Sequence, residues 1–124
     1  MKNTCLISIV FKNKNVTKCK EYYKSIIRYN YSNSIDFKYK KEIVLTRERI
    51  NHISKHVAFL PYLSRIFDYI NHPDEVLIYK NNPNNTRNII KNLDDHRRLF
   101  ITVRFATKDE MFYSSIISAR YETK

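Results

Sequence analysis

The sequence contains no glycine among its 124 residues. Walker and Rossmann phosphate-binding loops both need glycine where the backbone approaches the phosphates, so this absence excludes nucleotide binding of those two kinds. Cysteine is also scarce, with only Cys5 and Cys19. A domain with a full aliphatic core needs no disulfide, and we expect both thiols to be free and buried in a reducing compartment.

Long apolar runs are missing as well. No segment approaches the roughly 18 residues of a membrane-spanning helix. The apolar stretch Cys5 to Phe11 is not followed by the small-residue cleavage site of a signal peptide. We therefore expect a cytoplasmic protein with no membrane partner. Hydrophobic residues nevertheless make up 43% of the chain, which is enough for one domain over residues 1–124.

Acidic residues are few, and the formal net charge is +11. Residues 1–62 hold 13 basic and 4 acidic side chains, whereas residues 63–124 hold 10 and 8. A positive field concentrated in the first half of the chain favours a polyanion as partner. Nucleic acid is the commonest such partner, and an acidic protein or an anionic membrane would also fit.

Residues 1–44 are predicted to form a basic N-terminal β-α extension. The β-branched run Cys5 to Phe11 is typical of a buried strand. Apolar residues then recur at three-to-four spacing over residues 16–29, which predicts an amphipathic helix. Residues 30–34 have turn chemistry, and residues 35–45 favour a strand or extended arm. The exposed face of the predicted helix is basic, and its candidate RNA-binding residues are Lys18, Lys20, Lys24 and Arg28.

Residues 45–124 are predicted to form the core of the domain. Thr46 is a candidate N-cap for a helix that buries Ile50, Ile53, Val57 and Leu60. Pro61 breaks this helix, and a second helical period continues to residue 71. Short strand-like runs follow at residues 76–79, 88–93, 97–107 and 111–121. The fold class we predict is α+β, with helices packed on one face of a four-stranded antiparallel β-meander.

The run from Leu99 to Ala106 alternates regularly. Leu99, Ile101, Val103 and Phe105 are predicted to face the core, which leaves Thr102 and Arg104 on the available face. Ser114, Ser118 and Arg120 form a polar stripe on the final strand. A mid-strand arginine beside hydroxyl groups can bind phosphate, because its guanidinium donates to two oxygens at once. A solvated polar face would give the same pattern.

Two histidines stand on the helix that begins after Thr46. Arg49, His52 and His56 fall within about 60° of one another at 100° per residue, on a face at the boundary of the core. Two imidazoles near neutral pH can supply one base and one acid. A packed, hydrogen-bonded pair is the other interpretation. Zinc is disfavoured, because the motif has helical ligand spacing but no glutamate base and no third ligand.

Four short motifs occur in a recognisable order: His52-Ile53-Ser54-Lys55-His56, His72-Pro73-Asp74-Glu75-Val76, Leu99-Phe100-Ile101-Thr102-Val103 and Ile116-Ile117-Ser118-Ala119. In this order they resemble the barnase-EndoU-colicin-RelE-like ribonuclease superfamily, most closely its phage-associated branch. The resemblance extends from Leu45 to Tyr121. Ser118 replaces the usual threonine, and Arg120 stands where an aromatic residue is expected.

The resemblance implies metal-independent RNA cleavage without a cofactor, in which the 2′-hydroxyl attacks the neighbouring phosphate to form a cyclic phosphate. By motif, His52 and His56 take the acid and base roles, Ser118 the hydroxyl position, and Arg104 or Lys80 the phosphate. Further RNA contacts are expected from Arg49 and Arg120. We expect a small toxin or phage-defence effector that an acidic antitoxin or immunity protein neutralises. The alternative is a non-enzymatic nucleic-acid- or protein-binding module, such as a phage-encoded inhibitor.

Overall fold

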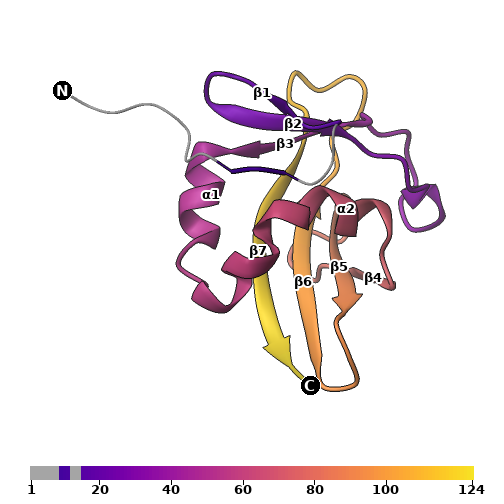
Figure 1. Cartoon of the computed structure of the whole chain (residues 1–124). Coiled ribbons are helices and arrows are strands. Elements are labelled where there is room, and N and C mark those ends of the chain that lie inside the picture. The colour runs from indigo at the N-terminus through magenta and orange to yellow at the C-terminus, as the bar shows by residue number, and fades with distance from the viewer. Residues whose placement is uncertain (1–8, 12–14) are drawn as a thin grey trace.

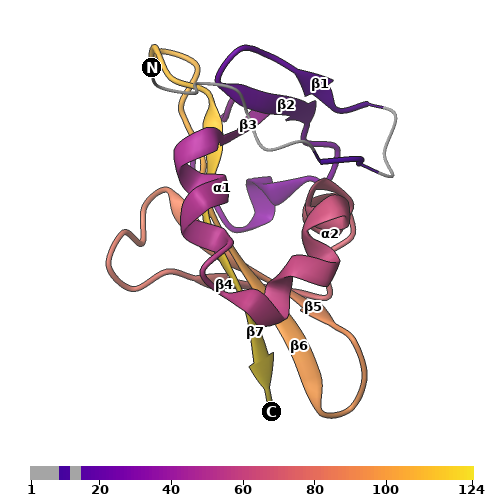
Figure 2. The ribbon, with the colours of Figure 1, turned by 60° about the vertical axis from the view of Figure 1, so that its left-hand side comes forward.

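A computed structural model describes residues 9–11 and 15–124. Its centre is one seven-stranded sheet in the order β1-β2-β3-β7-β6-β5-β4. All helical segments except a short turn lie on one face of this sheet, and the other face is open (Figures 1 and 2). The strands are β1 (Thr17–Lys18), β2 (Tyr22–Ile26), β3 (Glu42–Thr46), β4 (Glu75–Ile78), β5 (Thr86–Asn92), β6 (Arg97–Arg104) and β7 (Ser114–Thr123).

The helical layer consists of α1 (Arg47–Ile53), the 3₁₀ segment η2 (Val57–Arg65) and α2 (Ile66–Asn71). A further short 3₁₀ turn, η1 (Tyr31–Asn33), follows β2, where the sequence predicts a turn. The Thr46 hydroxyl caps α1 by accepting from the Arg49 backbone N–H at 3.2 Å, as expected for an N-cap threonine. Pro61 lies inside η2, which replaces the predicted α-helical continuation.

The predicted burial along the first helix is only half right. Ile50 and Ile53 are fully buried, but α1 ends at Ile53, and both Val57 and Leu60 are exposed. A 3₁₀ helix has three residues per turn, so the chain beyond α1 no longer presents the stripe that a continuous 3.6-residue period would bury. Phe59 and Leu63 face the core instead.

The predicted α+β class is confirmed, and so is the alternation from Leu99 to Phe105, but the sheet is not the predicted four-stranded meander. β4 to β7 pair antiparallel in sequence order, and Leu99, Ile101, Val103 and Phe105 are fully buried against the helices. The sheet is nevertheless larger than the predicted four strands. Ile43 and Val44 of β3 pair in parallel with Ser114 and Ser115 of β7, which attaches the β1–β3 antiparallel unit to the meander.

The helix predicted over residues 16–29 is wrong. This segment forms β1 and β2, in which Tyr23 and Ser25 are buried while Ile26 is exposed, and Ile27 directly after β2 is buried again. That period of two is the pattern of a strand with one buried face, and Tyr and Ile favour strands. The predicted strand at residues 5–11 lies outside the described residues up to residue 8, and residues 9–11 are not in a strand. Cys19 is free but only half-buried, whereas Cys5 lies outside the described residues.

Candidate nucleic-acid interface

Cross-strand register lines up polar side chains on the open face of the sheet. Thr102 of β6 pairs with Ser118 of β7, and Arg104 pairs with Ser115. Paired residues point to the same side, and their β6 neighbours Ile101 and Val103 face the helices. The predicted phosphate-binding residues Arg104 and Ser118 therefore share the open face.

A β-bulge separates these two pairs. The register shifts between Thr102 and Val103: Ser118 lies opposite Thr102, whereas Ile116 lies opposite Val103. Ile117 is thus the extra residue of β7. Bulges bend a strand and re-aim its side chains, and they are common next to active sites. The Thr102 hydroxyl donates to Asn88 Oδ1 at 2.7 Å, so the hydroxyl beside Ser118 is held in a fixed orientation.

Arg104 is held by an acidic residue from the turn that precedes β7. Its Nη2 donates to Glu110 Oε1, while Glu110 Oε2 accepts from the Thr107 backbone N–H at 2.7 Å. The hydrogen bond from Arg104 lowers the pKa of Glu110, and so does the bond from Thr107. A phosphate at this position would therefore meet a guanidinium that is oriented and already paired.

A second basic group lies further along the same face. The guanidinium carbons of Arg98 and Arg120 lie 4.7 Å and 4.5 Å from the centroid of the Phe100 ring. Glu122 accepts from Arg98 at 2.8 Å and from Arg120 at 3.5 Å. Phe100 is thereby buried although it faces away from the helices. Two arginines and one glutamate leave this cluster with a net positive charge.

The two candidate histidines are adjacent. The ring centroids of His52 and His56 lie 6.0 Å apart at an interplanar angle of 77°. Both side chains are exposed: His52 lies in the last turn of α1, and His56 lies beyond the end of the helix. The predicted placement at the core boundary is therefore wrong for both, and for His56 the reason is that the predicted continuous helix ends at Ile53. Helix α1 packs against β7 and β3.

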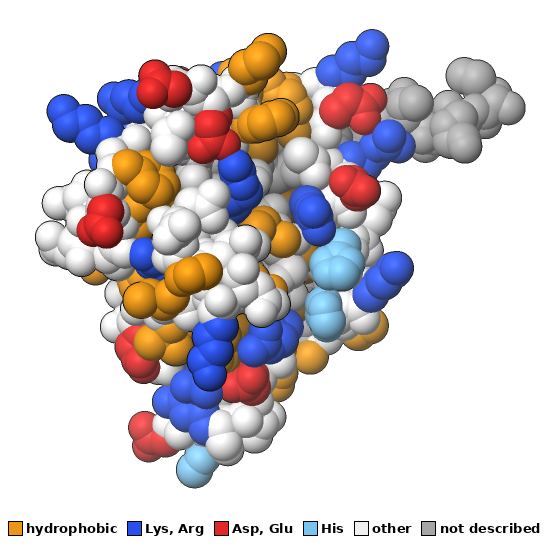
Figure 3. Space-filling model, turned by 180° about the vertical axis from the view of Figure 1, so that it is seen from behind, with side chains coloured by type: hydrophobic (Ala, Val, Ile, Leu, Met, Phe, Trp, Pro, Cys, Tyr) orange, Lys and Arg blue, Asp and Glu red, His pale blue; other side chains and the backbone are white. Residues whose placement is uncertain are grey.

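Figure 3 looks onto the open face of the sheet. Two adjacent histidine side chains lie at one margin, and Lys and Arg side chains surround them. Hydrophobic side chains gather in the upper part of the face, and a second group of basic side chains lies in its lower part. Histidine side chains thus lie at the margin of a face that also presents basic side chains.

The other candidate residues are spread over the molecule. Arg49 is half-buried on α1, three residues before His52. Lys80 follows β4, which is separated from β7 by β5 and β6, so the structure does not bring Lys80 to the histidines. Lys18, Lys20, Lys24 and Arg28 belong to the β1–β2 region rather than to one helix face. Among these four, Lys24 lies two residues after Tyr22 in β2, so the two side chains share a face. Lys24 also pairs with Val44, which places it on the open face.

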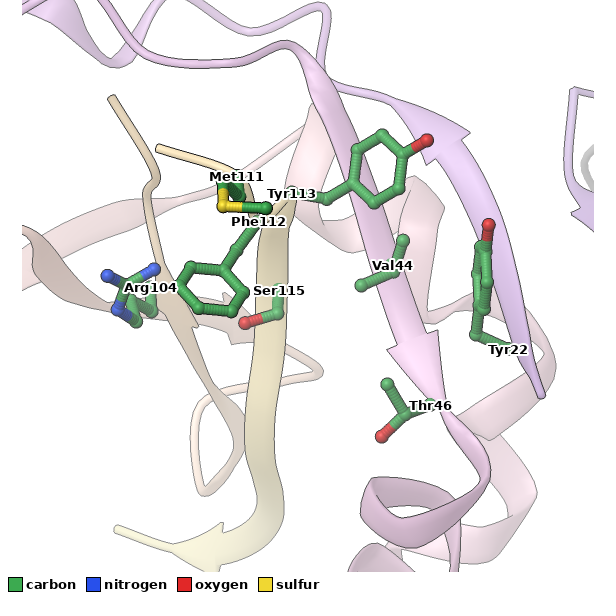
Figure 4. Close-up of a pocket in the computed structure, with 8 residues that line it drawn as sticks. All are labelled: Tyr22, Val44, Thr46, Arg104, Met111, Phe112, Tyr113 and Ser115. Atoms are coloured by element: carbon green, nitrogen blue, oxygen red, sulfur yellow. The ribbon is translucent and has the colours of Figure 1, made fainter. Parts of the chain in front are cut away.

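A hollow of about 600 Å³ on the open face was not predicted. Figure 4 shows Tyr22 and Phe112 on its opposite sides, with Val44 and Ser115 between them and Arg104 beyond Phe112. Met111 and Phe112 are 96% and 67% exposed. The sequence signal was the run Met111-Phe112-Tyr113 directly after a charged turn, because three consecutive exposed apolar residues are unusual without a function. We refer to this hollow as the aromatic groove.

No three His, Cys, Asp or Glu side chains within residues 9–11 and 15–124 are grouped so that they could hold a metal ion. The described helices also include none long and apolar enough to cross a membrane.

The fold and this face together define a small, basic α+β protein whose open sheet face presents arginine, hydroxyl and aromatic groups. Comparison with family models makes the assignment specific: residues 24–120 match the family described as phage-Barnase-EndoU-ColicinE5/D-RelE like nuclease3, and the chain belongs to this nuclease family. The resemblance drawn from the sequence motifs is thus confirmed, and the match begins within β2, upstream of Leu45. No curated protein and no solved structure matches the chain.

Proposed function

We propose that this nuclease cleaves RNA without a metal ion, by attack of a 2′-hydroxyl on the adjacent phosphate. The observation that carries the proposal is the pair of neighbouring imidazoles, His52 and His56, in a chain whose open sheet face presents arginine and hydroxyl groups. A nuclease of this kind needs a base, an acid and a cation near one phosphate. The chain offers all three kinds of group.

One imidazole in its neutral form removes the proton from the 2′-hydroxyl, and the 2′-oxygen attacks phosphorus. The other, as imidazolium, gives a proton to the departing 5′-oxygen. The P–O5′ bond breaks as the P–O2′ bond forms, and the products carry a 2′,3′-cyclic phosphate and a free 5′-hydroxyl. We assign His56 and His52 to these two roles. The proton taken up by one imidazole balances the proton given up by the other, and proton exchange with water restores both imidazoles before the next turnover.

Arg104 is the group we assign to the phosphate oxygens. Its Nη2 bond to Glu110 orients the guanidinium, and the remaining N–H groups can donate to the negative charge that develops in the transition state. Ser118 lies one bulge away on the neighbouring strand and supplies a hydroxyl donor. Arg120 and Arg98 would contact the backbone beyond the cleaved bond, because both guanidinium groups lie on the same face.

The biological role we propose is a toxin or phage-defence effector that acts in the cytoplasm. A net charge of +11 suits neutralisation by an acidic antitoxin or immunity protein, since complementary charge speeds association.

A specific observation also favours a second function. The pairing of Arg104 with Glu110 neutralises the central cation before any substrate arrives, as would suit a binding module without turnover. The two functions are separated by incubating single-stranded RNA with the protein in excess EDTA and identifying the product ends. Our proposal predicts a 2′,3′-cyclic phosphate and no cut at a site with a 2′-deoxy substitution. Intact RNA would contradict the proposed cleavage and favour the binding module. Cleavage at the 2′-deoxy site would contradict attack by the 2′-hydroxyl.

A further inference from the structure

The aromatic groove is not used by the proposed chemistry. Its walls are Tyr22 and Tyr113, whose ring centroids lie 6.2 Å apart, and the exposed ring of Phe112 on the opposite side. Val44 forms its buried floor. Exposed aromatic rings around a hollow of this size provide flat surfaces on which another ring can stack.

Positive charge surrounds the same groove. The Lys24 ammonium lies 5.3 Å from the Tyr113 ring centroid, and Arg104 borders the Phe112 side. A second hollow of about 510 Å³ shares Tyr113 with the groove. Its lining contains one acidic residue, Glu42, and three lysines: Lys40, Lys41 and Lys108. The aromatic rings and the nearby basic side chains together favour a ligand that combines a flat ring with negative charge.

We infer that the aromatic groove is a base-binding subsite for single-stranded nucleic acid. One unpaired base stacks between Phe112 and the paired rings of Tyr22 and Tyr113, and the adjoining phosphates lie against the lysines of the second hollow. The inference rests on the proposed function in one respect, which is that the bound polymer is RNA. It adds a position that determines where the substrate is held relative to Arg104, which lies at the end of the groove.

The aromatic lining, in combination with the positive charge, favours this occupant over a protein. An acidic protein partner would also be attracted by the lysines, but such a partner has no need of aromatic rings spaced around a narrow hollow. Stacking on aromatic side chains, together with a basic track for the backbone, is the usual way in which unpaired nucleotides are bound.

The test uses a fluorescently labelled 2′-O-methyl oligonucleotide of about 10 nucleotides, which cannot be cleaved by 2′-hydroxyl attack. Because its binding is read by anisotropy, the result does not depend on whether the chain cleaves RNA. Phe112→Ala and Tyr113→Ala should each raise the dissociation constant by about tenfold, whereas Tyr113→Phe should restore binding. Tyr29→Ala is the matched control: Tyr29 is 40% exposed, compared with 36% for Tyr113, but its backbone N–H contacts Asn71 of α2 on the helical side.

A second probe isolates the base. An oligonucleotide of the same length with one abasic position, moved along the chain, should bind the wild-type protein more weakly at one register, and Phe112→Ala should abolish that difference. Wild-type affinity in both alanine variants, or an equal loss in Tyr29→Ala, would overturn the inference. Failure of RNA cleavage with this binding pattern intact would instead count against the proposed chemistry alone.

Discussion

Arg104, the last residue of β6 on the open sheet face, is paired with Glu110 from the turn before β7. Glu110 also accepts from the Thr107 backbone, and its main-chain carbonyl accepts from the Lys40 ammonium. One acidic residue thus joins β6, the 108–113 turn and the segment before β3. The same contact orients the cation that we assign to phosphate and fixes the turn that carries Phe112.

The first prediction concerns pH. The pKa of Glu110 is lowered mainly by the hydrogen bond from Arg104, and that of Glu122 by the bond from Arg98. A carboxyl group with a lowered folded-state pKa stabilises the fold above its unfolded pKa of about 4.5, and this contribution is lost as pH falls through the folded value. Glu110→Gln should therefore reduce the melting temperature at pH 7 and flatten its decline below pH 4.5. Asp109→Asn removes the same charge from the same turn and should leave the profile as in the wild type. Parallel profiles for Glu110→Gln and wild type would contradict this account.

The second prediction concerns Arg87, which is buried and donates to three carbonyl oxygens. These belong to Pro83 at 2.7 Å, Thr86 at 2.9 Å and Ser34. Burial lowers the pKa of Arg87. The three hydrogen bonds hold the 81–86 loop against the end of η1. Arg87→Met leaves the carbonyls without donors and should lower the free energy of unfolding by about 2–4 kcal/mol in urea. Arg97→Met, which removes an exposed partner of Asp94, should have little effect. Equal losses in the two variants would contradict the buried role.

The third prediction concerns the start of α1. Because the Thr46 hydroxyl accepts from the Arg49 N–H, Thr46→Ala should destabilise the protein by about 1 kcal/mol, and Thr46→Ser should retain most of the stability. Hydrogen exchange at the first amides of α1 would show the loss locally. Identical exchange in the alanine and serine variants would mean that the cap contributes nothing.

The sequence predicted the parts of the fold that depend on neighbouring residues. The Thr46 cap and the alternation from Leu99 to Phe105 are both local, and both are present. The helix prediction for residues 16–29 was wrong because the apolar residues of this segment fit a helical period and a strand period alike. Only pairing with β3, which puts Tyr23 opposite Leu45, selects the strand.

The site was predicted less completely than the fold. The motifs pointed to His52, His56, Arg104 and Ser118, and the register places the last two on one face. Glu110 and the aromatic groove were missed. The groove depends on the parallel pairing of Val44 with Ser115, two segments about 70 residues apart, and no local pattern predicts such a pairing.

The fourth prediction concerns the basic front of the chain. Lys24 lies on the open face beside Tyr113, whereas Lys18 pairs with Tyr23 and belongs to the opposite face. Lys24→Glu should reduce the slope of log affinity against log salt for single-stranded RNA by about 0.7 for each phosphate that the variant no longer neutralises. Lys18→Glu makes the same charge change and should reduce the slope less. Equal slopes in the two variants would indicate that the lysines act only through net charge.

The proposed imidazole chemistry is tested most directly by the rate of cyclic-phosphate formation in excess EDTA. His56→Ala should lower this rate by about 10² or more while unfolding stays cooperative, and His52→Ala should have a similar or milder effect. His96→Ala, an exposed histidine in the β5–β6 turn, should cleave as the wild type does. If His52→Ala and His56→Ala both form cyclic phosphate at the wild-type rate, the imidazoles are not the acid and base, and the account of the site is wrong.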